Sequence, residues 1–212
     1  MTRTVRLSVG LLAVLWAQKS FEGSITYTTK VEGAMAAQMG EMIKSQMPDK
    51  MIVYYRGNKV RSEVGDAVVL TDGDAGFIYL LNPALKTYRK APLTPPQESD
   101  QAPTPKVVKT KDKAKVAGYA VERYDAEVST PQGEIKMQVW AAPALKVSEI
   151  AQRGNNLARG VKVDGIPLRI VMDVPGIDIK IVFLATQVQT TPPEEVLFKI
   201  PTDYVEEKEA ND

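Results

Sequence analysis

The side chains that could carry chemistry in this chain are carboxylates, lysines, arginines, tyrosines and hydroxyls, because its 212 residues include no histidine and no cysteine. Histidine is the usual general base, and it activates most serine and cysteine nucleophiles. Histidine and cysteine are also the commonest ligands for zinc, copper, haem and iron–sulfur clusters, and cysteine alone forms disulfides. We therefore expect a protein that is not an enzyme, with no catalytic residue, no cofactor and no metal site.

Two arrangements of carboxylates could instead indicate a metal site or a catalytic site. Asp72 and Asp74 stand in a glycine-rich stretch like the start of a calcium loop, but a further acid at the fifth position and a glutamate at the twelfth are missing. Asp173 and Asp178 could in principle hydrolyse a glycoside, but a chain with only 7% aromatic residues gives no sign of a sugar-binding cleft. We interpret the first arrangement as a turn and the second as a pair on a solvent-exposed face.

Methionines form a denser cluster, since five of the eight lie within seventeen residues. Apolar side chains recur between Ala34 and Met47 at the spacing of one helix face, and Pro48 ends the pattern. Thioethers can bind Cu(I), but helical packing explains this spacing and no histidine or cysteine assists. We favour a packing or lid helix, then contact with an apolar ligand, over a copper site. The apolar residues of this predicted helix are Met35, Met39, Met42, Ile43 and Met47.

Most of the remaining chain has the alternating pattern of short antiparallel strands. Residues 21–32 read as the first strand, and Gly57-Asn58 as a hairpin turn that sets Tyr55 opposite Val60. A short helix is predicted around residues 148–152. About nine strands are expected in all.

The clearest hairpin is predicted near the C-terminus. Folding residues 166–183 about Pro175-Gly176, through a turn wider than two residues, gives the strands one fully apolar face. This register pairs Leu168 with Phe183, Ile170 with Ile181, and Met172 with Ile179. It also sets Asp173 against Asp178.

The first seventeen residues have the layout of a signal peptide. Arg3 and Arg6 precede an uncharged apolar run that ends at Ala17, where we expect cleavage. The run is about half the length needed to span a bilayer, so no transmembrane span is expected. Removing the two arginines from 27 basic residues leaves 25 against 26 acidic residues, and this balance predicts no attraction to nucleic acid. We expect a monomer in the periplasm or secreted.

A change of composition marks residues 91–115, which contain five prolines and five lysines and few large apolar side chains. We expect a long exposed loop there, rather than an arm that binds nucleic acid. The predicted organisation is a signal peptide at 1–17, a single β-rich domain at 18–206 that includes this loop, and a solvated tail at 207–212.

Several predicted strand ends and turns have a recognisable sequence: Val53–Asn58, Thr71–Gly73, Phe77–Tyr79, Asn82-Pro83 and Glu195–Pro201 with Tyr204. These segments resemble the LolA/LolB-like superfamily of periplasmic lipoprotein carriers. Lys115–Tyr119, Val139–Ala142 and Gly165–Leu168 resemble more closely a secreted family of domains of unknown function, number 4412, in the same superfamily. The resemblance implies a curved, half-open antiparallel barrel with helices over its mouth and a cavity for acyl chains. It also implies a role for Arg56, which matches an arginine that the carriers place at the first hairpin turn.

These observations predict a mainly β (α+β) fold of LolA-like type, a curved antiparallel sheet or half-open barrel with one long and one short covering helix. We expect a non-enzymatic binding protein that holds a lipid-like ligand or a lipoprotein acyl group in an apolar cavity. The alternative is an envelope structural or sensing module that binds another protein through its sheet and has no ligand cavity. The expected ligand-binding residues are Met35, Met39, Met42, Ile43, Tyr55, Arg56, Leu168, Ile170, Met172, Ile181 and Phe183.

Overall fold

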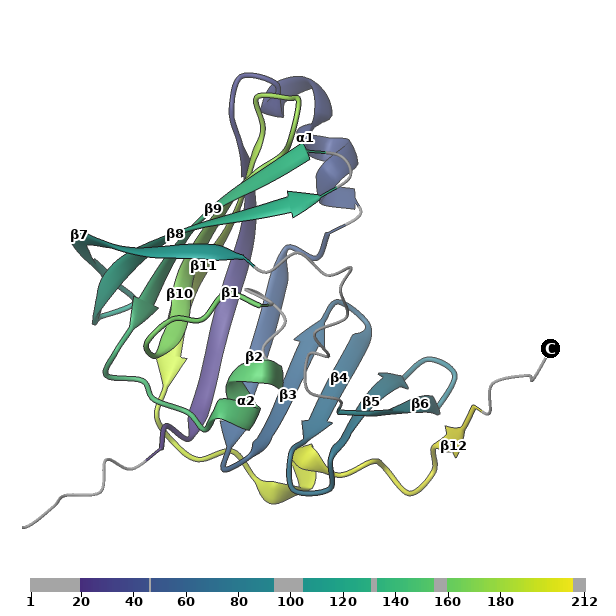
Figure 1. Ribbon diagram of the computed structural model, residues 1–212. Helices are drawn as coiled ribbons and strands as arrows, with labels where there is room; N and C mark the ends of the chain where they lie inside the picture. The colour runs from purple at the N-terminus through teal and green to yellow at the C-terminus, as the bar shows by residue number, and fades with distance from the viewer. Residues whose placement is uncertain (1–19, 46, 94–104, 131–132, 155–159, 208–212) are drawn as a thin grey trace, which may run out of the picture.

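A computed structural model describes residues 20–45, 47–93, 105–130, 133–154 and 160–207, with only the backbone at residues 44, 45 and 130. All twelve strands in the described part belong to one sheet, in the order β12-β6-β5-β4-β3-β2-β1-β11-β10-β9-β8-β7 (Figure 1). Neighbouring strands are antiparallel, except for the short β12, which runs parallel to β6. The predicted signal peptide and its cleavage site lie outside the described residues.

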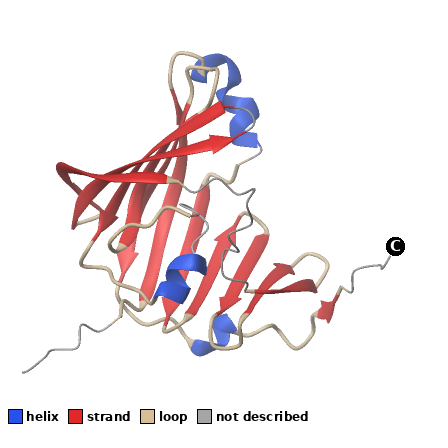
Figure 2. Ribbon diagram, viewed as in Figure 1, coloured by secondary structure: helices blue, strands red, loops and turns tan. Residues whose placement is uncertain are grey.

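The strands dominate the chain and the helices are few (Figure 2). The strands are β1 (Gly23–Glu32), β2 (Lys50–Arg56), β3 (Lys59–Val64), β4 (Ala67–Asp72), β5 (Phe77–Asn82), β6 (Thr87–Pro92), β7 (Lys106–Val116), β8 (Tyr119–Thr130), β9 (Gly133–Ala142), β10 (Ile166–Asp173), β11 (Lys180–Gln189) and β12 (Val205–Glu206). The helices are α1 (Ala36–Ser45), α2 (Glu149–Gly154) and the 3-10 helix η2 (Glu195–Phe198). None of the described helices is long and apolar enough to cross a membrane.

The predicted fold class is confirmed at this level: the protein is mainly β, and its strongly curved sheet does not close into a barrel. β1 lies at the centre, paired with β2 on one side and β11 on the other, so the first strand of the fold joins its two halves. The predicted helices occur at nearly the expected places, but α1 has ten residues and α2 only six. Twelve strands form in the described part, rather than about nine.

The hairpin between β2 and β3 forms as predicted. Gly57 takes a positive φ of 55°, which glycine adopts at little cost, and Tyr55 pairs with Val60 across the turn. The same register places Val53 opposite Ser62, so the alternation of apolar and polar residues set this pairing correctly.

The register predicted for the hairpin between β10 and β11 is wrong by two residues. Met172 pairs with Ile181, and Ile170 pairs with Phe183. The turn is wide, as predicted, and it is closed by the Val174 N–H, which donates to the Ile179 carbonyl oxygen at 2.9 Å. A shift of two residues keeps every side chain on its face, so the hydrophobic pattern could not exclude it. The new register sets Asp173 opposite Lys180 and removes the predicted repulsion with Asp178.

One segment expected to be a loop is partly strand, and the first residue of the predicted tail is hydrogen-bonded to the sheet. The predicted loop at 91–115 is wrong at both ends, because Ala91 and Pro92 belong to β6 and Lys106–Val116 forms β7, the edge strand that pairs with β8. Residues 94–104 lie outside the described part. Lysines on an exposed edge discourage pairing with another chain, and this explains a strand with so few large apolar residues. Glu207, the first residue of the predicted tail, donates its N–H to the Tyr88 carbonyl oxygen and accepts from Arg89. The rest of that tail, 208–212, is not described.

The C-terminal segment packs against one face of the sheet, and α2 packs against the other. Phe198 of η2 is buried on Val68, Leu70 and Leu81, on the face that we call the outer face. On the opposite, inner face, Gly154 of α2 lies so close to Thr71 that an added Cβ would stand 3.1 Å from the threonine side chain. The two covers therefore lie on opposite faces of the same strands, β3 and β4.

Candidate functional site

The inner face is the apolar side of the sheet's central strands. Ile25 pairs with Val53 on one side and with Val188 on the other, so these three side chains share a face. On the other half of the sheet, Ile170 pairs with Phe183 on β11 and with Val139 on β9. Buried apolar side chains on this face form two groups, which differ in how completely they are covered.

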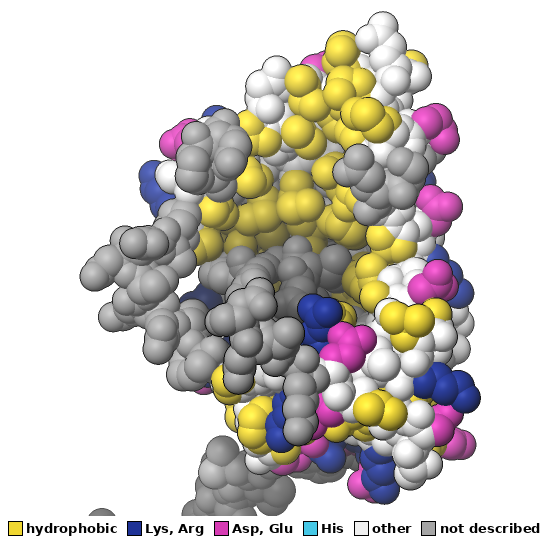
Figure 3. All heavy atoms as spheres, turned by 90° about the vertical axis from the view of Figure 1, so that its right-hand side faces the viewer, with side chains coloured by type: hydrophobic (Ala, Val, Ile, Leu, Met, Phe, Trp, Pro, Cys, Tyr) yellow, Lys and Arg dark blue, Asp and Glu magenta, His cyan; other side chains and the backbone are white. Residues whose placement is uncertain are grey.

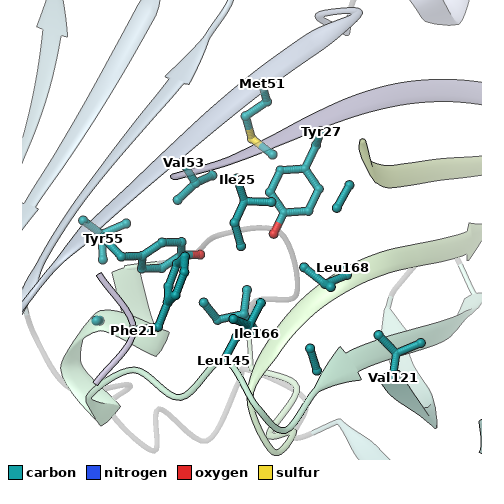
Figure 4. Close-up of a cluster of buried hydrophobic side chains, with 14 residues drawn as sticks. Phe21, Ile25, Tyr27, Met51, Val53, Tyr55, Val121, Leu145, Ile166 and Leu168 are labelled. Carbon is teal, nitrogen blue, oxygen red and sulfur yellow. The ribbon is translucent and has the colours of Figure 1, made fainter. Parts of the chain in front are cut away.

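The first group, the packed region, lies beneath α2 and the segment that leads into it (Figure 4). Ile25, Leu168 and Ala151 of α2 are fully buried in it. The packed region contains Phe21, Ile25, Tyr27, Met51, Val53, Tyr55, Leu145, Ala151, Ile166 and Leu168.

The packed region includes two tyrosines, each of which carries a polar hydroxyl into the apolar cluster. The Tyr27 hydroxyl donates to the Pro167 carbonyl oxygen at 2.7 Å, and the ring of Tyr55 meets that of Phe21 edge to face. Burial raises the pKa of the Tyr27 hydroxyl well above its ordinary value, and the nearby Tyr55 raises it further. The Tyr27 hydroxyl is therefore a structural donor that stays neutral, and not a nucleophile.

A small cavity of about 30 Å³ borders the packed region between Tyr55, Val161, Val163 and Ile166. That volume is about the share of one water molecule, whereas pockets for small ligands are roughly ten times larger. The packed region has no room for an acyl chain in this conformation.

The second group, the open region, continues the inner face toward the β10–β11 turn. Its buried floor includes Met137, Val139 and Ile170, and half-buried apolar side chains stand around them. Figure 3 shows a hollow in this side of the molecule whose visible wall is hydrophobic. The open region consists of the half-buried Val107, Val128, Ile135, Val163, Met172 and Phe183.

Helix α1 sits at the end of the inner face that carries the open region (Figure 1). Its Gly40 packs on Val31, whose strand neighbour Ile181 pairs in turn with Met172. The Asp178 carboxylate accepts the Ala34 N–H at 3.2 Å just before the helix begins, where a negative charge favours the helix dipole. α1 is thus fixed to β1 and to the β10–β11 turn, beside the hollow.

The residues predicted to bind a ligand divide into three sets. Tyr55, Leu168 and Ile170 lie on the inner face but are at most 1% exposed, so they are covered by other side chains. Met172, Ile181 and Phe183 are half-buried on the same face. Met35 just before α1 is also half-buried, as are Met39 and Ile43 on α1, where Met42 is 54% exposed. Arg56 is not brought together with the others, because its guanidinium donates to the Pro193 carbonyl oxygen of the C-terminal segment on the outer face.

Sequence reasoning missed several side chains of the open region. Val128 and Ile135 alternate with polar neighbours in two strands that were expected, so their position on the inner face could have been found. Val107 was hidden by the assignment of its segment to a loop. Val163 lies in an irregular segment, where no periodic pattern marks the buried positions.

The inner face is chiefly apolar. In the described part of the chain, no group of three or more acidic residues could hold a metal ion. The acids whose pKa is lowered, such as Glu122 beside Lys109 and Glu149 beside Arg153, are paired with cations at the surface. What this arrangement offers a ligand is hydrophobic burial.

A family model described as "Domain of unknown function (DUF4412)" matches residues 21–204. Among solved structures, an uncharacterized conserved protein from Thermus thermophilus is similar, with 11% identity, a TM-score of 0.46, and coverage of 86% of this chain and 90% of the other. A structure described as a putative outer membrane lipoprotein-sorting protein domain from Vibrio parahaemolyticus has 14% identity, a TM-score of 0.33, and coverage of 86% and 92%. The search of curated proteins found no match.

Proposed function

The chain belongs to the DUF4412 family of domains of unknown function, as its sequence motifs predicted, and we propose that it is an exported, non-enzymatic protein that binds an apolar ligand with an acyl chain. The observation that carries this proposal is the open region, a group of half-buried Met, Phe, Ile and Val side chains on the inner face, together with the hydrophobic hollow that Figure 3 shows. Apolar side chains gathered in a hollow are the usual wall of a lipid site. The resemblance of the sequence to the lipoprotein carriers favours the same class of ligand.

We propose that α1 is the lid of this site. Met35 and Met39 have unbranched, flexible side chains that repack around ligands of different shapes. Moving α1 would replace its contacts with Val31 by contacts with the ligand, so the buried apolar area would change little and binding would be of modest affinity.

The test uses N-phenyl-1-naphthylamine, an uncharged probe whose fluorescence rises in apolar sites. We expect Phe183→Ser and Met39→Asp to weaken its binding about tenfold, because each puts a polar group into the apolar wall. Leu85→Asp is the control, since Leu85 is 66% exposed in the turn after β5. Equal affinity in Phe183→Ser and Leu85→Asp would show that the open region is not the site. Unchanged binding in Met39→Asp alone would reject the lid.

Native mass spectrometry of the protein purified from its own cell envelope, followed by organic extraction, would identify a natural ligand. A bound lipid or acylated peptide would support a carrier and name its substrate. The same spectra test export, because processing after Ala17 leaves a chain that begins at Gln18.

The second candidate is an envelope module that binds another protein through its sheet. The filled packed region favours it, because the cavity that the described residues leave beside Tyr55 is only about 30 Å³. A clean apo mass together with no binding of N-phenyl-1-naphthylamine would support the module and reject the carrier.

A further inference from the structure

A groove of about 270 Å³ lies on the outer face of the sheet, behind the strands that carry the open region. Arg169 on β10 pairs with Leu184 on β11 and with Trp140 on β9, so these three side chains stand side by side on that face. Lys30 on β1 stands next to them, opposite Val182. All five line the groove.

The other wall of the groove comes from β7. Ala114, Lys115 and Val116 line it together with Lys30, although four strands separate β7 from β1 in the sheet. In a flat sheet five strand spacings would put these strands roughly 24 Å apart. The end of the β7–β8 hairpin must therefore bend toward the outer face, and a bulge between Lys109 and Lys113 marks where the strand departs from regular pairing.

Three cations around the groove have no partner in the described part of the chain. The side chains of Lys30, Lys115 and Arg169 make no hydrogen bond and no ion pair with any described residue. The neighbouring Arg123 is paired twice, with Asp112 at 2.9 Å and with Asp125 at 2.7 Å. Glu32 also lines the groove, so three positive charges face one carboxylate there and an anion would be attracted.

Trp140 gives the groove an aromatic surface and a second unsatisfied group. Its indole Nε1 is buried and donates to no described acceptor, although a buried indole N–H usually has a partner. With Leu184, Val182 and Val116 it supplies the apolar part of the lining. The groove thus combines unpaired cations with an apolar surface.

We propose that this outer groove binds a small anionic amphiphile, a molecule with one carboxylate, sulfonate or phosphate head and an aromatic or short aliphatic body. Arg169 and the two lysines would hold the head, and Trp140 and Leu184 the body. At about 270 Å³ the groove is at the lower limit for small-molecule sites, so a long acyl chain does not fit it. The proposal does not depend on the inner hollow, which lies on the opposite face.

The experiment compares two naphthyl probes of similar size, the anionic 1-anilinonaphthalene-8-sulfonate and the uncharged N-phenyl-1-naphthylamine. The full chain carries Trp16→Phe, which leaves Trp140 as the only tryptophan, so energy transfer from Trp140 reports binding. We expect Arg169→Gln to raise the Kd of the sulfonate at least fivefold, and Arg169→Lys to keep most of the affinity, because the charge is retained. Glu32→Gln should lower that Kd about twofold.

Lys199→Gln is the matched control, because it removes one positive charge at an exposed position after η2. Each groove variant should leave binding of the uncharged probe unchanged. Equal sulfonate affinity in Arg169→Gln and Lys199→Gln would overturn the proposal, as would no binding of the sulfonate by the parent chain. Loss of sulfonate binding in Phe183→Ser but not in Arg169→Gln would also overturn it, by placing that probe in the inner hollow.

Competition then distinguishes the sources of the anionic head. Decanoate and decyl phosphate should displace the sulfonate, and whichever does so at lower concentration names the preferred head group. Decanol is the uncharged control. Displacement by decanol as strong as by the two anions would reject recognition of charge.

Discussion

The packed region and the open region share one face of one sheet and are built from the same kinds of side chain, but they differ in cover. Leu168 and Met172 show the difference within a single strand: both point to the inner face of β10, and Leu168 is 0% exposed whereas Met172 is half-buried. α2 and the segment before it cover Leu168, whereas Met172 faces the hollow beside α1.

This difference separates stability from binding. A face that is covered completely contributes its hydrophobic free energy to folding, whereas a half-covered face keeps part of that free energy for a ligand. The packed region would then hold the sheet together while the open region stays available. Predictions that compare the two regions test whether this division is real.

The largest expected effect is the loss of packing at Leu168. Leu168→Ala should lower the free energy of unfolding by about 3 kcal/mol, because it leaves a cavity among fully buried neighbours. Met172→Ala, four residues along the same strand, should cost only about 1 kcal/mol, since its side chain is already partly in water. Urea unfolding of both variants measures the contrast. Equal losses would mean that the open region is as much a part of the core as the packed region.

The next effect concerns the hydroxyl of Tyr27. Tyr27→Phe should lower the free energy of unfolding by about 1–2 kcal/mol at neutral pH, because the Pro167 carbonyl oxygen loses its buried donor. The same urea series includes Tyr54→Phe as the matched variant, because Tyr54 is half-buried on the outer face and water can replace its hydroxyl. If Tyr54→Phe lowered the free energy of unfolding as much as Tyr27→Phe, burial of the Tyr27 hydroxyl would not make its hydrogen bond more stabilising.

The same hydroxyl gives a dependence on pH whose sign follows from burial. The pKa of Tyr27 is raised in the folded protein, so its contribution is complete below about pH 10, the value in an unfolded chain, and is lost as the pH rises above it. Above pH 10 the free energy of unfolding of the parent protein should fall more steeply than that of Tyr27→Phe, by up to about 1.4 kcal/mol per pH unit. The raised pKa values of Tyr54, Tyr79 and Tyr88 are present in both proteins and cancel in this difference. Parallel curves for the two proteins would show that Tyr27 is not sealed from water.

The packed region was the more predictable of the two from sequence. Alternation in β2 and β3 fixed the face of Val53 and Tyr55, and Gly57 fixed the turn between the strands, so local pattern and turn chemistry agreed. In the hairpin of β10 and β11 the pattern gave the correct faces but the wrong register. A pattern of period two is unchanged by a shift of two residues, and only the wide turn selects between the alternatives.

The open region was less predictable because its cover is irregular. Val161 and Val163 follow no period, and they lie on the sheet only through long-range packing. The contact between Arg56 and the C-terminal segment could not be predicted either, because the hairpin pattern gives no information about which segment covers the outer face of the hairpin. The strand β7 carried a usable signal in its alternating Lys109, Lys111, Lys113 and Lys115, but prolines just before it favoured a loop.

The smallest predicted effect decides whether α1 moves when the open region is filled. Gly40→Ala should raise the free energy of unfolding by about 0.5–1 kcal/mol, because alanine favours the helix and its Cβ would make an ordinary contact with Val31 at 3.9 Å. If α1 must leave Val31 for a ligand to enter, the same variant should weaken binding of N-phenyl-1-naphthylamine about two- to fivefold. Ala37→Gly is the matched variant, because it lowers helix propensity at an exposed position of α1. If α1 undocks as a rigid unit, only Gly40→Ala should change the binding of the probe. If α1 unfolds when the ligand enters, Gly40→Ala should weaken binding and Ala37→Gly should strengthen it. Unchanged binding in both would make α1 a fixed wall of the hollow, and the difference between the two regions would then be permanent.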